Sequence, residues 1–209
     1  MFTGIIESIG QIKTVEPLQD SAYAGVRLAV HAPTLDFSDV KLGDSIAIQG
    51  ACMTVVAMEK QTFHVDVSQE SLSKTVGLSQ PGEVNLEKAM RLSDRVGGHL
   101  VSGHVDGLGS VVDFSPVGES WHLQIRAPKT LSPFFAYKGS VTVNGVSLTV
   151  NKVDDHVSGE CDIHINLIPH TVQMTTLKHL KTGSPVNLEI DQIARYCERI
   201  VKTMNLNQG

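Results

Sequence analysis

Gly50-Ala51-Cys52-Met53-Thr54-Val55-Val56 occurs a second time, in altered form, as Gly145-Val146-Ser147-Leu148-Thr149-Val150-Asn151. The glycine, the threonine and the valine after it keep their places, and Cys52 aligns with Ser147. The two copies lie 145 − 50 = 95 residues apart. A repeat of this length is typical of two tandem domains rather than of a solenoid of short units.

Other segments repeat in the same order, which extends the duplication over almost the whole chain. The aligned pairs are residues 3–10 with 102–109, 28–33 with 123–128, 45–50 with 140–145, 69–71 with 169–171, and 82–87 with 183–189, the last with one extra residue. The offset changes only between these blocks, where loops are expected. We therefore predict two homologous halves, with a linker around residues 89–101.

Each half carries signals for short β-strands. Residues 45–48, 63–67 and 141–143 alternate apolar and polar side chains, and residues 53–56 and 148–150 are rich in β-branched ones. Gly, Asp or Asn separates these runs about every ten residues, as in small barrels and sandwiches. We predict an all-β chain with one six-stranded antiparallel barrel in each half. Residues 34–40 and 130–137 are predicted to form one or two helical turns.

The end of the chain has a different pattern, which predicts an amphipathic helix beginning after Asp191, a plausible N-cap. Apolar residues recur there at helical spacing. These are Ile193, Ala194, Cys197, Ile200, Val201 and Met204. The helix could dock on its own barrel or pack against the same helix of other subunits, and the sequence leaves both open. The predicted domains are residues 1–97, 98–190 and 191–209.

Composition excludes several classes of function. The net charge of −5 argues against a nucleic-acid partner. Three cysteines without a CxxC pair fit a reducing compartment better than a disulfide framework. The N-terminus does not look like a signal peptide, and no stretch is long and apolar enough for a membrane span. We expect a cytoplasmic protein that binds neither membrane nor nucleic acid.

The run of residues 97–104, GGHLVSGH, is the first candidate for a ligand site, because small residues allow close approach. His99 and His104 do not have the spacing of a zinc site, so we expect no metal, and a structural role is the alternative for both. Cys52 is either a nucleophile, a hydrogen-bonding group or a buried strand residue. Its counterpart Ser147 favours a ligand contact, and the repeated Thr54 and Thr149 suggest paired hydroxyl donors.

Four motifs together resemble the riboflavin synthase family of the α-chain type: MFTGII at residues 1–6, GGHLVSGH, the GACMTV and GVSLTV pair, and NLIPHT at residues 166–171. The resemblance implies two Greek-key barrels and a C-terminal helix that assembles a homotrimer. It also implies a dismutation without metal or organic cofactor. Two molecules of 6,7-dimethyl-8-ribityllumazine, a donor and an acceptor, give riboflavin and 5-amino-6-ribitylamino-2,4(1H,3H)-pyrimidinedione by transfer of a four-carbon unit.

The resemblance implies two substrate pockets, each built in one barrel. For the N-terminal barrel the expected residues are Gly4, Ile5, Ile6, Cys52, Met53, Thr54, Asp66, Val67, Ser68, Gln69, Glu70 and Ser71. For the C-terminal barrel they are Gly103, His104, Val105, Lys138, Ser147, Leu148, Thr149, Asn166, Leu167, Ile168, Pro169, His170 and Thr171. Each active site would lie between the N-terminal barrel of one subunit and the C-terminal barrel of its neighbour.

The resemblance also implies which residues lie near the chemistry: Phe2, Ser45, Cys52, His104, Ser147, Thr149 and Asp191. The first step removes a proton from the C7 methyl of the donor, and His104 is the first candidate to assist because its usual pKa lies near neutral pH. Cys52, Ser147 or water would add to C7 of the acceptor.

The sequence departs from the pattern of this family at two positions. Ala51 stands before Cys52, and His170 stands where a carboxylate would mirror Glu70. The resemblance implies that His170 would change how the ribityl chain is held.

Two competing functions fit the same residues. A lumazine-binding antenna protein would share this fold without turnover. A β-barrel flavin oxidoreductase would need a nicotinamide-binding segment, which the sequence does not contain.

Overall fold

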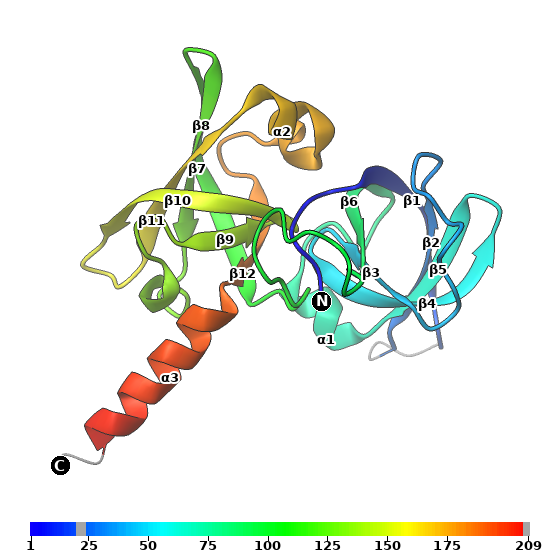
Figure 1. The fold of residues 1–209 in the computed structure, drawn as a ribbon, viewed down its shortest axis with the longest axis horizontal. Helices are drawn as coiled ribbons and strands as arrows, with labels where there is room; N and C mark the ends of the chain where they lie inside the picture. Colours follow the sequence, from blue (N-terminus) through cyan, green and yellow to red (C-terminus); the bar gives the residue numbers. More distant parts are fainter. Residues whose placement is uncertain (20–23, 207–209) are drawn as a thin grey trace.

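The computed structural model describes residues 1–19 and 24–206, which form two closed six-stranded barrels followed by a helix (Figure 1). The strands of the first barrel are β1 (Ser8–Pro17), β2 (Val26–His31), β3 (Ser45–Ile48), β4 (Ala51–Glu59), β5 (Thr62–Val67) and β6 (Gly82–Lys88). The second contains β7 (Gly107–Val117), β8 (Ser120–Ala127), β9 (Ser140–Val143), β10 (Val146–Asp155), β11 (Cys161–Leu167) and β12 (Pro185–Ile190). The fold predicted from the repeat is confirmed.

The two barrels have the same topology. Their neighbours run β1-β2-β5-β4-β3-β6 in the first and β7-β8-β11-β10-β9-β12 in the second, and every pairing is antiparallel. The register of the motif strands is also repeated, because Thr54 pairs with Ser45 and Thr149 with Ser140. The order β5-β4-β3-β6 places strands that are distant in sequence side by side, as in a Greek key.

Alternation along each strand fills the barrels. In β4, Met53 and Val55 point into the core while Thr54 and Val56 are exposed, which is the period of two that a half-buried strand requires. Each barrel has its own apolar core, so each half is packed as a separate unit.

Short helices follow β5 and β11 at equivalent places. They are α1 (Gln69–Lys74) and α2 (Pro169–Met174), and α2 leads into the 3₁₀ helix η2 (Thr176–His179). The helical turns predicted after each Ala-Pro pair are found only in the second half, as η1 (Ser132–Phe134), which has a proline in its first turn. Residues 34–40 form turns and bends instead. There Asp36 caps the turn by accepting a hydrogen bond from Ser38 N at 2.9 Å.

A symmetric polar network joins the barrels. Asn85 Nδ2 donates to the carbonyl of Asn144, and Asn187 Nδ2 donates to the carbonyl of Gln49, both at 2.9 Å. In each barrel the same residues also pair with each other, since Asn85 N donates to Gln49 Oε1 and Asn187 N to Asn144 Oδ1. All four are buried. The equivalent residues of the repeat therefore meet across a local pseudo-two-fold axis.

Gly50 and Gly145 lie on this axis and face each other. A Cβ on Gly50 would lie 2.7 Å from Gly145 N, and a Cβ on Gly145 would lie 2.9 Å from Gly50 N. Both glycines also have positive φ, of 89° and 83°. The repeated glycine is needed twice over, for its backbone conformation and for the close contact of the barrels.

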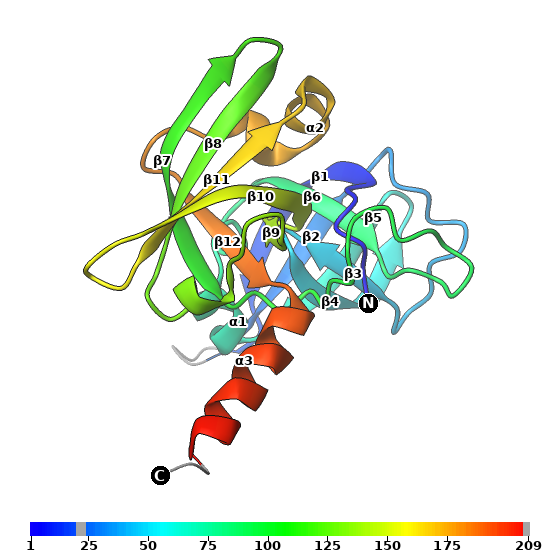
Figure 2. The same ribbon diagram turned by 60° about the vertical axis from the view of Figure 1, so that its left-hand side comes forward.

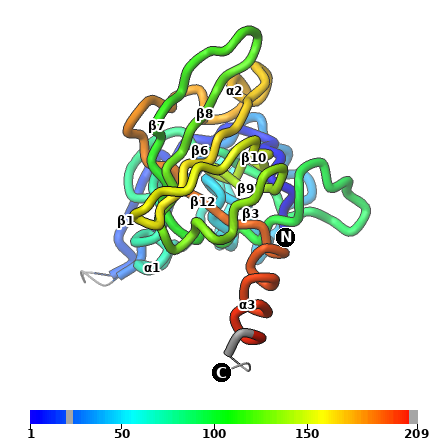
Figure 3. Tube along the Cα trace, turned by 90° about the vertical axis from the view of Figure 1, so that its left-hand side faces the viewer, coloured from blue at the N-terminus to red at the C-terminus, as the bar shows by residue number. Residues whose placement is uncertain are grey.

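The helix α3 (Gln192–Leu206) projects away from both barrels (Figures 2 and 3). Asp191 Oδ1 accepts a hydrogen bond from Ile193 N at 2.9 Å, which is the capping contact expected from the sequence. Ile193, Ile200 and Met204 are 71%, 58% and 62% exposed. The apolar stripe of α3 is therefore uncovered in the single chain, and no described helix is long and apolar enough to span a membrane.

Candidate functional site

The motif strands β4 and β10 present Cys52 and Ser147 at equivalent places, each half-buried. A glycine from a distant segment packs against each of them. Cys52 N donates to the carbonyl of Gly103 at 2.7 Å, and Ser147 N donates to the carbonyl of Gly4 at 2.8 Å. A Cβ on Gly103 would lie 2.7 Å from Cys52 Cβ, and one on Gly4 would lie 2.6 Å from Ser147 Cβ. Only glycine permits these contacts, and φ is positive at both.

Each of these contacts joins a segment of one half of the chain to the barrel of the other half. The sequence had instead placed each segment beside the motif strand of its own half. Gly4, Ile5 and Ile6 were expected beside Cys52, but they lie on the second barrel, where Ile6 packs against the core. Gly103, His104 and Val105 were expected beside Ser147, but they lie on the first barrel, where Val105 packs against the core. The physical reason is the pseudo-two-fold axis, across which each segment reaches the opposite barrel.

A cavity of about 270 Å³ lies where the crossing segment meets the first barrel. It is lined by Ala51, Cys52, Met53, Glu70, Ser71, Lys74, Thr75, Gly103, His104 and Val105. The structure thus brings together the predicted residues of β4, of α1 and of the segment after the linker. α1 is fixed there because Ser68 Oγ accepts from Ser71 N at 3.1 Å.

His104 lies at the edge of this cavity and of a second one. The second, of about 420 Å³, is lined by Ser102, His104, Val105, Asp106, Gln192, Arg195 and Tyr196. The imidazole of His104 is therefore exposed beside both Cys52 and the start of α3, where Arg195 is paired with Asp106 at 2.6 Å. A group at this place can exchange protons with a ligand and with solvent.

His99 stands in the GGHLVSGH run but was not among the residues expected in the pockets or near the chemistry. Its Nδ1 lies 2.7 Å from Ser147 Oγ. Burial lowers the pKa of His99, and nearby Asp191 opposes that shift. The side chain is thus held neutral beside a hydroxyl, an arrangement that can accept or relay the hydroxyl proton. His99 and Asp191 also line a cavity of about 210 Å³ at the start of α3.

Several predicted residues are engaged in other contacts. Asp66 forms a two-point ion pair with Arg27 at 2.7 and 2.8 Å, which lowers the pKa of the carboxyl and keeps it ionised. Its counterpart Asn166 accepts from Ser120 Oγ at 2.9 Å. Lys138 Nζ donates to Asn151 Oδ1 at 3.1 Å. Asp66 and Asn166 lie at the ends of β5 and β11, directly ahead of α1 and α2, whereas Lys138 lies in the turn before β9.

Phe2 is fully buried and lines none of the cavities described above. It forms an isolated antiparallel bridge with Val101 and packs in a small apolar cluster with Ala47, Val101 and Cys52. Phe2 therefore packs beside Cys52 in this cluster. The predicted Ser45 pairs with Thr54 and borders a cavity of about 290 Å³ at the start of β3.

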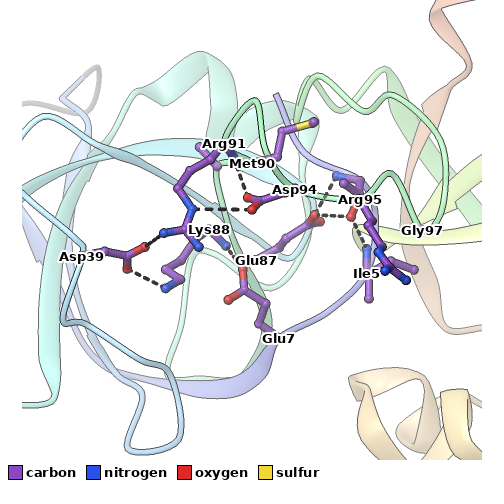
Figure 4. Close-up of a pocket in the computed structure, with 12 residues that line it drawn as sticks. Ile5, Glu7, Asp39, Glu87, Lys88, Met90, Arg91, Asp94, Arg95 and Gly97 are labelled. Atoms are coloured by element: carbon purple, nitrogen blue, oxygen red, sulfur yellow. Dashed lines mark hydrogen bonds and ion pairs between the residues drawn. The ribbon is translucent and has the colours of Figure 1, made fainter.

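A further pocket, of about 370 Å³, lies under the linker (Figure 4). Its wall carries an ion-pair network in which Asp39 contacts Lys88 at 2.7 Å and Arg91 at 3.3 Å. Arg91 in turn contacts Asp94 at 3.5 Å. This network fixes the linker to the first barrel just before the GGHLVSGH run, so it sets where His99 begins its approach to Ser147.

Comparison with known proteins relates this geometry to a family. Residues 3–89 and 102–191 each match the lumazine binding domain. The riboflavin synthase of Photobacterium phosphoreum is 43% identical over 203 residues, covering 96% of this chain and 89% of that protein. That of Brucella abortus (strain 2308) is 40% identical over 209 residues, covering 97% and 98%. That of Bacillus subtilis (strain 168) is 37% identical over 210 residues, covering 100% and 93%.

A solved structure shares the whole architecture. The crystal structure of LumP complexed with riboflavin superposes with a TM-score of 0.78 at 25% identity, covering 92% of this chain and 100% of that one. The match extends over both barrels. With the domain model matched in both halves and full-length enzymes as relatives, this chain belongs to the riboflavin synthase family.

Proposed function

We propose that this enzyme converts two molecules of 6,7-dimethyl-8-ribityllumazine into riboflavin and 5-amino-6-ribitylamino-2,4(1H,3H)-pyrimidinedione. The observation that carries the proposal is the paired arrangement of Cys52 with Gly103 and Ser147 with Gly4. We infer from these equivalent contacts one ligand-binding place on each barrel, and two such places suit a reaction that consumes two copies of one molecule. Holding the copies face to face would supply most of the rate acceleration, because effective molarities of oriented reactants are large.

Donor and acceptor play different parts, and the two pockets differ accordingly. The methyl carbons that form the new bonds belong to the acceptor, so the proton is removed from the C7 methyl of the acceptor and not, as expected from the resemblance, from that of the donor. We assign this proton removal to His104, which lies beside the cavity at Cys52. The methyl is acidic because its anion delocalises into the lumazine ring, so a weak base suffices. The bonds from C6 and C7 to nitrogen break in the donor, so we assign the activating addition to C7 of the donor. Water or the hydroxyl of Ser147 would add there, with neutral His99 as the proton acceptor.

The reaction balances without an added reagent. The four-carbon unit of the donor, C6 and C7 with their methyl groups, is transferred to the acceptor, whose two methyl carbons become ring carbons of the new xylene ring. The donor leaves as the diamine. No electrons are lost or gained overall, so the chain needs only to bind, align and move protons.

We further propose that three copies of the chain assemble through α3. Its apolar residues Ile193, Tyr196, Ile200 and Met204 lie on one face and are all more than half exposed in the single chain. A second and third copy of the same helix would cover them. Each active site would then combine the Cys52 pocket of one subunit with the Ser147 pocket of its neighbour.

Incubation of the purified protein with the lumazine alone tests the function, followed by the absorbance of riboflavin. We expect one riboflavin for every two lumazines consumed, without added cofactor. Tight binding with the lumazine left intact would identify an antenna protein instead. Oxidation of NAD(P)H by a bound flavin would identify an oxidoreductase.

Replacing His99 by glutamine should lower kcat about tenfold or more, because Ser147 would lose its proton acceptor. In the unchanged enzyme, activity should fall as the pH drops through the pKa of His99, which burial places below its usual value of about 6.5. His99→Gln should lack this acidic limb in a pH–rate profile. His179→Gln, which alters an exposed histidine paired with Glu83, is the matched control. An unchanged acidic limb in His99→Gln would contradict the assignment.

A further inference from the structure

Two buried glutamates bind the segments that cross between the barrels, and the mechanism above does not use them. Glu189 in β12 is 2% exposed. Its Oε1 accepts from Ser102 N at 2.7 Å, and its Oε2 accepts from Gly103 N at 3.0 Å and His104 N at 2.9 Å. Three successive backbone amides thus donate to one carboxylate. This resembles the nest of amides around a bound anion, but here the anion is a side chain of the protein.

Glu87 in β6 makes the equivalent contacts in the other half and is 4% exposed. Its Oε1 accepts from Thr3 N at 2.6 Å and from Thr3 Oγ1 at 2.8 Å, and its Oε2 accepts from Gly4 N at 2.9 Å. Figure 4 shows Glu87 with Ile5, the residue after Gly4, on the wall of the pocket under the linker. The two glutamates occupy the same place in the repeat, as do the segments they bind.

Each glutamate binds a segment that packs on the opposite barrel. Glu189 belongs to the second barrel, but the segment that it binds continues to Gly103, whose carbonyl accepts from Cys52 N of the first barrel. Glu87 belongs to the first barrel, but its segment continues to Gly4, whose carbonyl accepts from Ser147 N of the second. Each carboxylate is therefore the link between its own barrel and the pocket wall of the other one.

We propose that Glu189 is a positioning residue for the cavity wall beside Cys52, and that Glu87 is a positioning residue for the segment that packs against Ser147. Glu189 fixes the backbone of His104, and Glu87 fixes Gly4 against Ser147. The effect on catalysis rests on the function proposed above. The crossed dependence, by which a glutamate of one barrel fixes the segment that packs on the other barrel, does not rest on it.

The contacts require ionised carboxylates. All the groups that face Glu189 Oε1 and Oε2 are N–H donors, so a proton on either oxygen would meet a donor instead of an acceptor. Burial nevertheless raises the pKa of Glu189 to about 7, and the nearby carboxylate of Asp106 acts in the same direction. Asp106 is itself paired with Arg195 of α3, and His104 is the other titratable group on the bound segment. Burial likewise raises the pKa of Glu87, with Glu7 nearby.

Amide hydrogen exchange on the full-length protein tests the crossed dependence directly. In Glu189→Gln, the peptide covering residues 50–56 should exchange about tenfold faster, while residues 145–151 keep their protection. In Glu87→Gln the pattern should be reversed. Glu160→Gln, which alters a glutamate that accepts a hydrogen bond from Ser158 in the loop before β11, is the matched control and should change neither peptide. If Glu87→Gln cannot be purified, Thr3→Val removes a single bond to Glu87 and should give a weaker change at residues 145–151.

Riboflavin titration of the same variants gives a second readout that needs no turnover. Each glutamine variant should weaken one class of riboflavin-binding site about tenfold and leave the other unchanged. In a separate assay with the lumazine as substrate, KM should rise more than kcat falls. Faster exchange confined to the barrel that carries the substitution would overturn the proposal, as would equal loosening of both peptides. If the wild-type protein binds lumazine but forms no riboflavin, the proposed function fails while the exchange experiment still decides this inference.

Discussion

Replacing Ile200 by aspartate should separate the proposed trimer into single chains and lower the rate of riboflavin formation about 100-fold or more. Ile200 is 58% exposed in the isolated chain and lies in the middle of the apolar face of α3. A carboxylate there would have to be desolvated in a helix–helix interface, which is strongly unfavourable. Single chains would keep both pockets but would no longer align donor and acceptor, and alignment supplies most of the rate.

Light scattering coupled to gel filtration would give the mass, and absorbance at the riboflavin band would give the rate. Arg199→Asp introduces the same side chain on the neighbouring, polar part of the helix and should keep the trimer. A variant of Ile200 that remains trimeric and active would contradict the role given to α3. A monomeric variant with full activity would instead show that one chain contains a complete active site.

Replacing Asn187 by alanine should lower the free energy of unfolding by about 3 kcal/mol, because buried partners would be left without hydrogen bonds. Asn187 Nδ2 donates to the carbonyls of Gln49 at 2.9 Å and Val76 at 3.1 Å, and its Oδ1 accepts from Val76 N at 2.8 Å. The side chain is 1% exposed. Urea denaturation, followed by fluorescence and by circular dichroism, measures the loss.

The equivalent variant Asn85→Ala should behave similarly, because Asn85 spans the same axis in the other direction. Asn151→Ala, at a position outside the interface, should change stability by less than about 0.5 kcal/mol. A loss for Asn187→Ala no larger than that of the control would show that the barrels are held together by other contacts. Different urea midpoints by fluorescence and by circular dichroism would show that the barrels unfold independently.

Much of the fold was predictable because the sequence contains the same barrel twice. The pairs Gly50 with Gly145 and Thr54 with Thr149 located the equivalent strands, and the apolar spacing after Asp191 located α3. The turns at residues 34–40 were wrongly predicted as helical, since the Ala-Pro signal is the same in both halves. Only the second copy has a proline inside the following turn, at Pro133.

The arrangement of the site was less accessible from sequence. An alignment shows that Gly4 is equivalent to Gly103, and that Cys52 is equivalent to Ser147. It does not show which glycine packs on which strand, because both pairings satisfy the same repeat. His99, Glu87 and Glu189 were also missed as site residues. A signal existed for the glutamates, because a charged residue stands at a core position of the last strand in both copies.

The crossed segments also have a consequence for the order in which the enzyme can become functional during its synthesis. The first barrel leaves the ribosome first, and its strands end at Lys88. The wall of its pocket, however, is supplied by Gly103 and is fixed by Glu189, close to the end of the chain. Domains generally fold as they emerge, so the first barrel should form early and yet remain unable to close around a ligand. A nascent chain therefore acquires both pockets together, only after its last strand has been translated.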